Sequence, residues 1–389
     1  MGTRDENDRH RSGDLPDDPF ADAVPVVNAA EAAANAERGK QEAAVGALPW
    51  LTVPPEWIGD RPPTRTYLLH DAPGPGGFDV RGPGMLPRGK VAMLAAAGGV
   101  GKTYALCGLA LSLVTRRPWL SHFPVGEDLR RRVVLVLGEE DPDEVRRRLY
   151  TQAHAMGLDP STHGDDVAGI LALPGVGLAA LALTRPKEEE STFGPRTAFA
   201  EGLRAYLEAH AGTGWDAVIL DPLSRFAGPD VEVDNAAATR LIQVLEGFTK
   251  LPGGPAVILA HHTNKASRTV DTPTAATAVR GSSALVDGAR WVANLEDVPL
   301  PMGAKLPGHA RFRVTKSNYG TFPKSYTADG LLLTRMDGGL RVANGDEQTA
   351  LRTAELEAKR IEGEKGAQNK AARAEGGRRA SRTSDDGLA

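Results

Sequence analysis

The chain has 389 residues, a formal net charge of −4 and a single cysteine, Cys107. One thiol excludes intrachain disulfides and any zinc site made of several cysteines, and it favours a reducing compartment, which we expect to be the cytoplasm. The sequence has neither an apolar run of about 18 residues nor an apolar segment near its charged N-terminus, so we expect no export and no membrane partner.

The apolar pattern is dense only between about residues 81 and 341, which predicts one large core domain. We place this core at residues 61–345, after a disordered or helical N-terminal arm at 1–60. A stretch rich in proline and glycine, Pro54 to Gly84, predicts a linker or short edge strands. The tail at 346–389 is helix-prone at first and then basic and disordered, with side chains that either rest on phosphates or stay solvated.

Within the core, short apolar runs alternate with helical patterns. Runs of this length, bounded by turn or charged residues, are typical of buried strands. The first four are Val91–Ala95, Val133–Leu137, Ala217–Leu220 and Ala256–Ala260. Their alternation with helices predicts an α/β fold with a mostly parallel sheet flanked by helices. Later runs have no long helices between them and predict additional antiparallel strands at residues 291–295, 311–314 and 330–334.

The first run leads into a glycine-rich loop that opens a helical pattern, Ala95-Ala-Ala-Gly-Gly-Val-Gly-Lys-Thr103. Backbone N–H groups of such a loop cradle phosphates, its lysine reaches the β and γ phosphates, and its final hydroxyl holds Mg²⁺. These roles fall to Gly98, Gly99, Val100, Gly101, Lys102 and Thr103. The loop therefore predicts a nucleotide site with ATP and Mg²⁺ as cofactors. Ala96 stands where the pattern GxxxxGK[ST] has its first glycine, which leaves a chance glycine-rich turn as the alternative.

Working groups of an open α/β sheet gather at the carboxyl ends of its strands, so the residues after the other runs are candidates too. The second run ends in Gly138-Glu-Glu-Asp141, and Glu140 is our candidate for the base that orients and deprotonates water. The alternative is a solvated turn or helix start. The third run ends at Asp221, whose carboxylate could bind the Mg²⁺ shell or could only cap a helix or turn.

The fourth run is followed by His261-His-Thr-Asn-Lys265. His262, or its neighbour His261, could sense the γ-phosphate and pass its presence to the following loop. Paired histidines also bind zinc, but no third ligand has suitable spacing, so we expect no zinc site. The loop itself is long and polar, and its Lys265 and Arg268 are candidate contacts to a DNA backbone. An ordinary surface loop is the alternative.

The chain carries six motifs in order, at Gly98–Thr103, Leu137–Pro142, Leu220–Phe226, His261–Lys265, Arg280–Trp291 and Lys316–Gly320. Together they resemble the motifs of RepA-type replicative helicases, a RecA-like branch of the hexameric ATPases. The resemblance covers roughly residues 84–322 and implies a RecA-like P-loop core. It implies that Lys102 and Thr103 bind phosphates and Mg²⁺, Glu140 activates water, Asp221 is the second metal-site acid, and His262 or His261 senses the γ-phosphate.

The same resemblance matches Arg280 to an arginine placed against the nucleotide of a neighbouring subunit. The residue also has a physical case of its own, because it ends a proline-broken segment just before Gly281. A guanidinium at a mobile loop end suits a finger that neutralises charge on a transferring phosphoryl group. A surface salt bridge is the alternative. Lys316 could accompany Arg280 at such an interface.

These features lead us to expect an ATP-dependent DNA helicase that forms a homohexameric ring, translocates on single-stranded DNA and unwinds duplex during replication. The sequence has no cysteine-rich zinc module and no second catalytic domain, so we expect a separate primase or initiator protein as a partner. Two alternatives stay open. One is a recombination or strand-exchange ATPase of the same fold, and the other is a regulatory nucleotide-binding module.

Overall fold

The computed structural model describes residues 36–37, 40, 51–72, 84–178, 181–185, 196–228, 230–262, 283–299, 305–320, 322–336, 339–357, 360–361, 363–365 and 368. The chain divides into two compact units, residues 1–63 and 64–389. The first unit contains the short helix α2 (Glu56–Gly59). The domain boundaries that we placed at residues 60 and 345 remain predictions.

The second unit consists of strands alternating with helices, followed by a run of strands. Its strands are β1 (Tyr67–His70), β2 (Gly84–Pro87), β3 (Val91–Ala96), β4 (Val133–Leu137), β5 (Ile170–Pro174), β6 (Ala217–Asp221), β7 (Ala256–His262), β8 (Trp291–Pro299), β9 (Lys305–Ser317), β10 (Leu331–Met336) and β11 (Gly339–Val342). Its helices are α3 (Lys102–Thr115), α4 (Pro142–Ala155), α5 (Pro160–Val167), α7 (Ala198–Ala209), α8 (Leu223–Phe226), α9 (Asn235–Phe248), α10 (Ser283–Gly288) and α11 (Lys324–Thr327). Residues 345–357 are also helical.

One nine-stranded sheet organises this unit, in the order β11-β10-β9-β8-β3-β7-β6-β4-β5. The strands from β8 to β5 are parallel, whereas β9, β10 and β11 continue the sheet in antiparallel pairs. The α/β fold with a mostly parallel sheet, flanking helices and antiparallel C-terminal strands is confirmed. The two short strands β1 and β2 form a separate antiparallel pair.

The sequence-based direction of β8 is wrong. We expected the run at residues 291–295 to be antiparallel, but β8 lies parallel to β3, with Ala92 paired to Trp291. The chain between His262 and Trp291 is long enough to return to the starting end of the sheet, since a parallel connection needs about a dozen residues or more. It also contains the short helix α10. The antiparallel part of the sheet therefore begins one strand later than expected.

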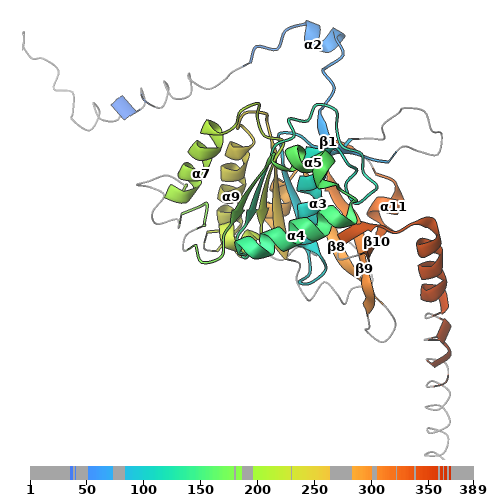
Figure 1. Cartoon of the computed structure of the whole chain (residues 1–389). Coiled ribbons are helices and arrows are strands. Elements are labelled where there is room, and N and C mark those ends of the chain that lie inside the picture. The colour runs from blue at the N-terminus through green and yellow to red at the C-terminus, as the bar shows by residue number, and fades with distance from the viewer. Residues whose placement is uncertain are drawn as a thin grey trace, which may run out of the picture. The chain divides into compact units, whose positions relative to one another are not determined.

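Helices cover both faces of the sheet, with α3 and α4 on one face and α7 and α9 on the other (Figure 1). Successive side chains of a strand point to opposite faces of the sheet, so β3 contributes to the core on both sides. Leu94 packs in the same core cluster as Leu106 of α3. Met93 packs with Leu207 of α7 and Leu241 of α9. Among the described residues, no helix has the length and apolar character needed to cross a membrane.

Cys107 lies on α3 and is completely buried. Burial raises the pKa of its thiol to about 12, with the Asp221 carboxylate adding to the shift. A neutral, inaccessible thiol is a poor nucleophile and a poor metal ligand. The residue therefore serves as a small apolar group in the core.

Four strands that are consecutive in the sheet, β3, β7, β6 and β4, carry polar residues at their carboxyl ends. Parallel strands bring these ends to one edge of the sheet, which is where ligands of open α/β folds bind. The glycine-rich loop follows β3, the two histidines end β7, Asp221 ends β6, and Glu139 and Glu140 follow β4. The strand order thus gathers residues that are far apart in the sequence.

Candidate nucleotide-binding site

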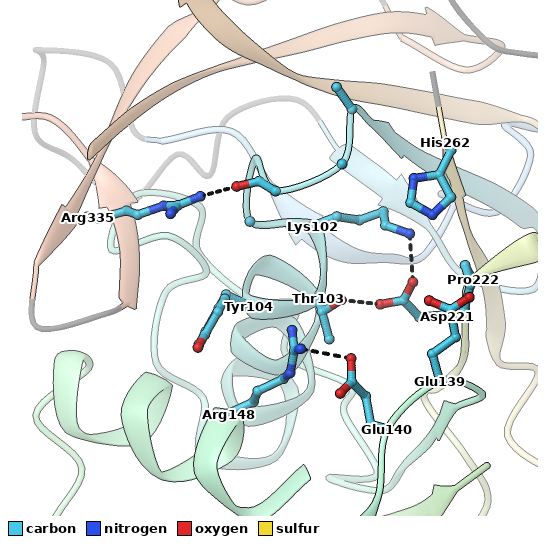
Figure 2. A pocket seen from close by; sticks show the side chains of 14 residues that line it. Lys102, Thr103, Tyr104, Glu139, Glu140, Arg148, Asp221, Pro222, His262 and Arg335 are labelled. Atoms are coloured by element: carbon cyan, nitrogen blue, oxygen red, sulfur yellow. Dashed lines mark hydrogen bonds and ion pairs between the residues drawn. The ribbon is translucent and has the colours of Figure 1, made fainter. Parts of the chain in front are cut away.

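A pocket of about 260 Å³ opens at this edge of the sheet. Its volume is near the lower end of the range for small-molecule sites, roughly 300–1,000 Å³. The residues that line it are Ala97, Gly98, Gly99, Gly101, Lys102, Thr103, Tyr104, Glu139, Glu140, Arg148, Asp221, Pro222, His262 and Arg335. Figure 2 shows that most of its labelled side chains are charged or polar. A pocket with this lining suits a charged ligand.

The glycine-rich loop has a backbone that requires glycine at two positions. Gly99 has a φ of 79° and Gly101 a φ of 108°, both in the left-handed region that other residues rarely adopt. A Cβ on Gly101 would also lie 2.8 Å from Cδ1 of Leu340. Helix α3 begins directly after Gly101, so its first N–H groups face the pocket and favour an anion there. Ala96, where the usual glycine is missing, is the buried last residue of β3 and lies outside this strained turn.

Lys102, Thr103 and Asp221 form a compact hydrogen-bonded group (Figure 2). Lys102 Nζ lies 2.7 Å from Asp221 Oδ1, and the Thr103 hydroxyl donates to Oδ2 at 2.6 Å. Lys102 and Asp221 are 7% and 4% exposed, so the pair is shielded from most of the solvent. A hydroxyl and a carboxylate oxygen side by side are the kind of ligands that Mg²⁺ takes in proteins. The ammonium next to them could bind phosphate oxygens.

Glu140 also lines the pocket, where its Oε1 lies 2.8 Å from Nη2 of Arg148 on α4 (Figure 2). The chain turns into α4 directly after Glu140 because Asp141 caps the helix by accepting from the Glu144 N–H, and Pro142 follows. Burial raises the pKa of Glu140, the charges of Glu144 and Asp221 add to the rise, and Arg148 opposes it. A carboxylate with a raised pKa is better matched to accepting a proton near neutral pH.

Glu139, the other acid of the pair, is more exposed and has a different cation as its neighbour. Its Oε1 lies 3.5 Å from Nε of Arg225 on α8. In Figure 2 its side chain extends toward Asp221, whereas that of Glu140 extends toward Arg148. Both acids line the pocket. The geometry alone therefore leaves both of them within the site.

The structure separates the two histidines at the end of β7. His262 lines the pocket, whereas His261 is 1% exposed, and its Nδ1 accepts the backbone N–H of His262 at 2.9 Å. Burial and the charge of Lys102 lower the pKa of His262. A lowered pKa favours the neutral ring, which can both donate and accept a hydrogen bond. No group of three His, Cys, Asp or Glu residues with metal-binding geometry occurs in the described part of the chain.

Three of the residues predicted from the sequence, Arg280, Lys265 and Arg268, lie outside the described residues. Val100 belongs to the loop, but it is buried in the core and does not line the pocket. Lys316 is away from the pocket, where its Nζ donates to the carbonyls of Val286 and Asp287 at 2.8 Å each. Within one chain Lys316 thus holds the end of α10.

Sequence reasoning missed Tyr104, Arg148, Pro222 and Arg335 as lining residues. Arg148 carried a weak signal, because it lies four residues after Glu144 on a helix that begins next to Glu140. Arg335 carried none, since it belongs to β10 and reaches the loop only through the fold. Its Nη2 donates to the Gly99 carbonyl at 2.7 Å. The hairpin of β10 and β11 therefore supports the glycine-rich loop from outside.

The site is a P-loop nucleotide-binding core of the RecA-like type. Its features are a strand, a glycine loop with left-handed residues, a helix that begins with lysine, and an aspartate on a nearby parallel strand. The family model described as "AAA domain" matches residues 51–268, more than half of the chain, so the chain belongs to this family. It is thus a nucleotide-binding protein of the ATPase type. A search of curated proteins finds no match to the chain.

Proposed function

We propose that the protein is a RepA-type, RecA-like DNA helicase that hydrolyses ATP with Mg²⁺. The observation that carries this proposal is a meeting of five residues at the ends of four adjacent strands: Lys102, Thr103, Asp221, Glu140 and His262. All five belong to motifs that the sequence shares with RepA-type helicases. Membership of the AAA domain family supports the ATPase part of the proposal.

Each residue has a role that its surroundings favour. Lys102 and the N–H groups of the glycine loop bind the phosphates, and Thr103 and Asp221 hold the Mg²⁺, which supplies charge neutralisation. Glu140 takes the proton of the attacking water, helped by its raised pKa. The neutral His262 senses the γ-phosphate. His261 acts behind it, by accepting the N–H of His262.

We expect Glu140→Gln to bind ATP nearly as well as the wild type but to lose turnover by about 10²–10⁴-fold, the range that a positioned base contributes. The amide keeps the shape of the side chain but cannot accept a proton. Turnover of ATP and equilibrium binding of a fluorescent ATP analogue measure the two effects separately.

Glu139→Gln is the matched control, because the two acids are neighbours and both line the pocket. We expect it to keep most of the turnover, since Glu139 is more exposed and faces Arg225. Normal turnover in Glu140→Gln together with lost turnover in Glu139→Gln would show that Glu139 is the base.

The proposal also includes DNA unwinding, which requires an assembly of subunits and contacts to DNA. We propose that the protein forms a homohexameric ring around single-stranded DNA, that Lys265 and Arg268 contact its backbone, and that a separate primase or initiator protein assists it. The loop with these two cations directly follows His262 in the sequence, so a change at the γ-phosphate has a short path to the DNA.

Electron microscopy with an ATP analogue and single-stranded DNA tests the assembly, and strand displacement on a forked duplex tests the activity. We expect closed six-membered rings and ATP-dependent unwinding that is lost in Lys265→Ala/Arg268→Ala while basal ATP turnover is kept. Open filaments without unwinding would favour a strand-exchange ATPase. A protein that binds ATP without turnover would favour a regulatory module.

A further inference from the structure

Arg148 lines the pocket, but the proposed function gives it no role. It lies on α4 and is 20% exposed. Its Nη2 lies 2.8 Å from Oε1 of Glu140, and its Nε lies 3.0 Å from Oε1 of Glu144. The guanidinium also lies 5.4 Å from the ring centroid of Tyr104, the residue after Thr103. One cation thus contacts the candidate base, its own helix and the start of α3.

The negative charges around Glu140 oppose its ionised form, and the Arg148 cation counteracts them. Glu144 on the same helix and Asp221 on β6 both act on Glu140 as negative charges, and the buried Cys107 thiol of α3 is neutral. Among the described residues, Arg148 is the positive group that acts on Glu140. Without it, the carboxylate would face two like charges in a partly buried place, which disfavours its ionised form.

Two neighbouring side chains, Glu144 and Tyr104, support the position of Arg148. Glu144 is one helical turn before it, at the spacing that brings side chains together on one face. That turn is anchored by the Asp141 cap. On the other side the guanidinium rests over the Tyr104 ring, a favourable contact for a cation. A charged group held from two sides can hold a third group in one orientation.

We propose that Arg148 is a positioning residue for ATP hydrolysis, which holds the Glu140 carboxylate in the orientation needed to accept the proton of water and ties it to the phosphate-binding end of α3. The inference rests on the proposed ATPase function and on Glu140 as its base. It makes the active geometry depend on a residue of α4, which belongs neither to the glycine-rich loop nor to the end of β6.

The test uses Arg148→Met in the full chain, because methionine keeps an unbranched apolar stem but removes the charge. We expect its turnover to fall by about 10- to 100-fold, part of what a positioned base supplies, while binding of an ATP analogue changes by less than about threefold. The acid limb of the pH–rate profile should move to higher pH, because loss of the cation raises the pKa of Glu140 further. Arg148→Lys should restore part of the rate.

Arg147→Met is the matched control. Arg147 is the preceding residue on α4, is 63% exposed, and pairs with Glu144 at 2.8 Å instead of Glu140. We expect its turnover and pH profile to match the wild type. Thermal unfolding of all variants shows whether a loss of rate reflects a loss of folded protein.

A double variant separates positioning from a merely structural role. In the Glu140→Gln background, single-turnover rates should show no further loss on adding Arg148→Met, because the two residues act as one unit. Wild-type turnover in Arg148→Met, or an equal loss in both backgrounds, would overturn the proposal even though Glu140→Gln is inactive. Full turnover in Glu140→Gln would instead overturn the assignment of the base, so the two failures are distinguishable.

Discussion

Lys102→Ala should lose ATP turnover by at least about 10²–10³-fold, the cost of removing one donor that stabilises charge in a reaction. Lys102 pairs with Asp221, which is proposed to hold Mg²⁺ together with Thr103. No side chain remains in its place to neutralise the phosphates. Steady-state turnover and binding of an ATP analogue measure the effect, and retained hydrolysis would contradict the assignment of the nucleotide site.

The same substitution should also lower the stability of the folded chain. Removing one partner of a buried ion pair costs about 3–5 kcal/mol, because the other charge is left without compensation. Thr103 still donates to Asp221, so we expect a folded protein with a lower melting temperature. The double variant Lys102→Ala/Asp221→Asn removes both charges and should recover stability without recovering turnover. Recovery of both would show that Lys102 has only a structural role.

Arg280→Ala should bind ATP nearly as well as the wild type and lose turnover by about 10³–10⁵-fold, the range for arginine fingers. The reason is that an arginine finger stabilises the transition state in the site of a neighbouring subunit. It contributes little to ATP binding in the site of its own subunit. Turnover and analogue binding, measured at protein concentrations where the ring is assembled, test this expectation.

Mixing two inactive proteins provides a sharper test of Arg280. A Lys102→Ala subunit still offers its Arg280, and an Arg280→Ala subunit still offers an intact glycine loop, so mixed rings should regain activity where the two good halves meet. Subunit exchange is first checked with fluorescent labels. If exchange occurs and activity does not return, Arg280 has a local role such as a surface salt bridge.

The central strands could be predicted from the sequence because they are buried on both faces. β4, for example, is a run of five buried apolar residues and begins and ends where the run does. β5 is also an apolar run, Ile170–Pro174, yet it was not among the predicted strands, and it lies at the edge of the sheet with each residue only partly buried. β7 runs two residues beyond its apolar stretch, to His262, because backbone pairing with β3 continues there regardless of side-chain polarity. An apolar run thus indicates a buried strand, but it does not give the residue at which backbone pairing ends.

The phosphate side of the site was predictable because its residues follow strands directly, at positions where topology alone brings them together. Arg148 and Arg335 were not, because their places depend on how helices and hairpins pack. Arg335 is separated from Gly99 by 236 positions, and no local pattern marks such a contact. The start of α4 also decides which acid, Glu139 or Glu140, faces Arg148. A shift of this start by one residue would exchange the two acids, and the sequence does not fix it so closely.

The placement of β8 and of the β10–β11 hairpin determines how short an expressible fragment of this protein can be. A fragment cut at residue 268, where the family match ends, would leave one side of β3 with unpaired N–H and C=O groups, an edge that invites aggregation. It would also remove Arg335 from the Gly99 carbonyl and Leu340 from Gly101. A nucleotide-binding fragment therefore has to extend through β11, at Val342, although the recognisable family sequence stops much earlier.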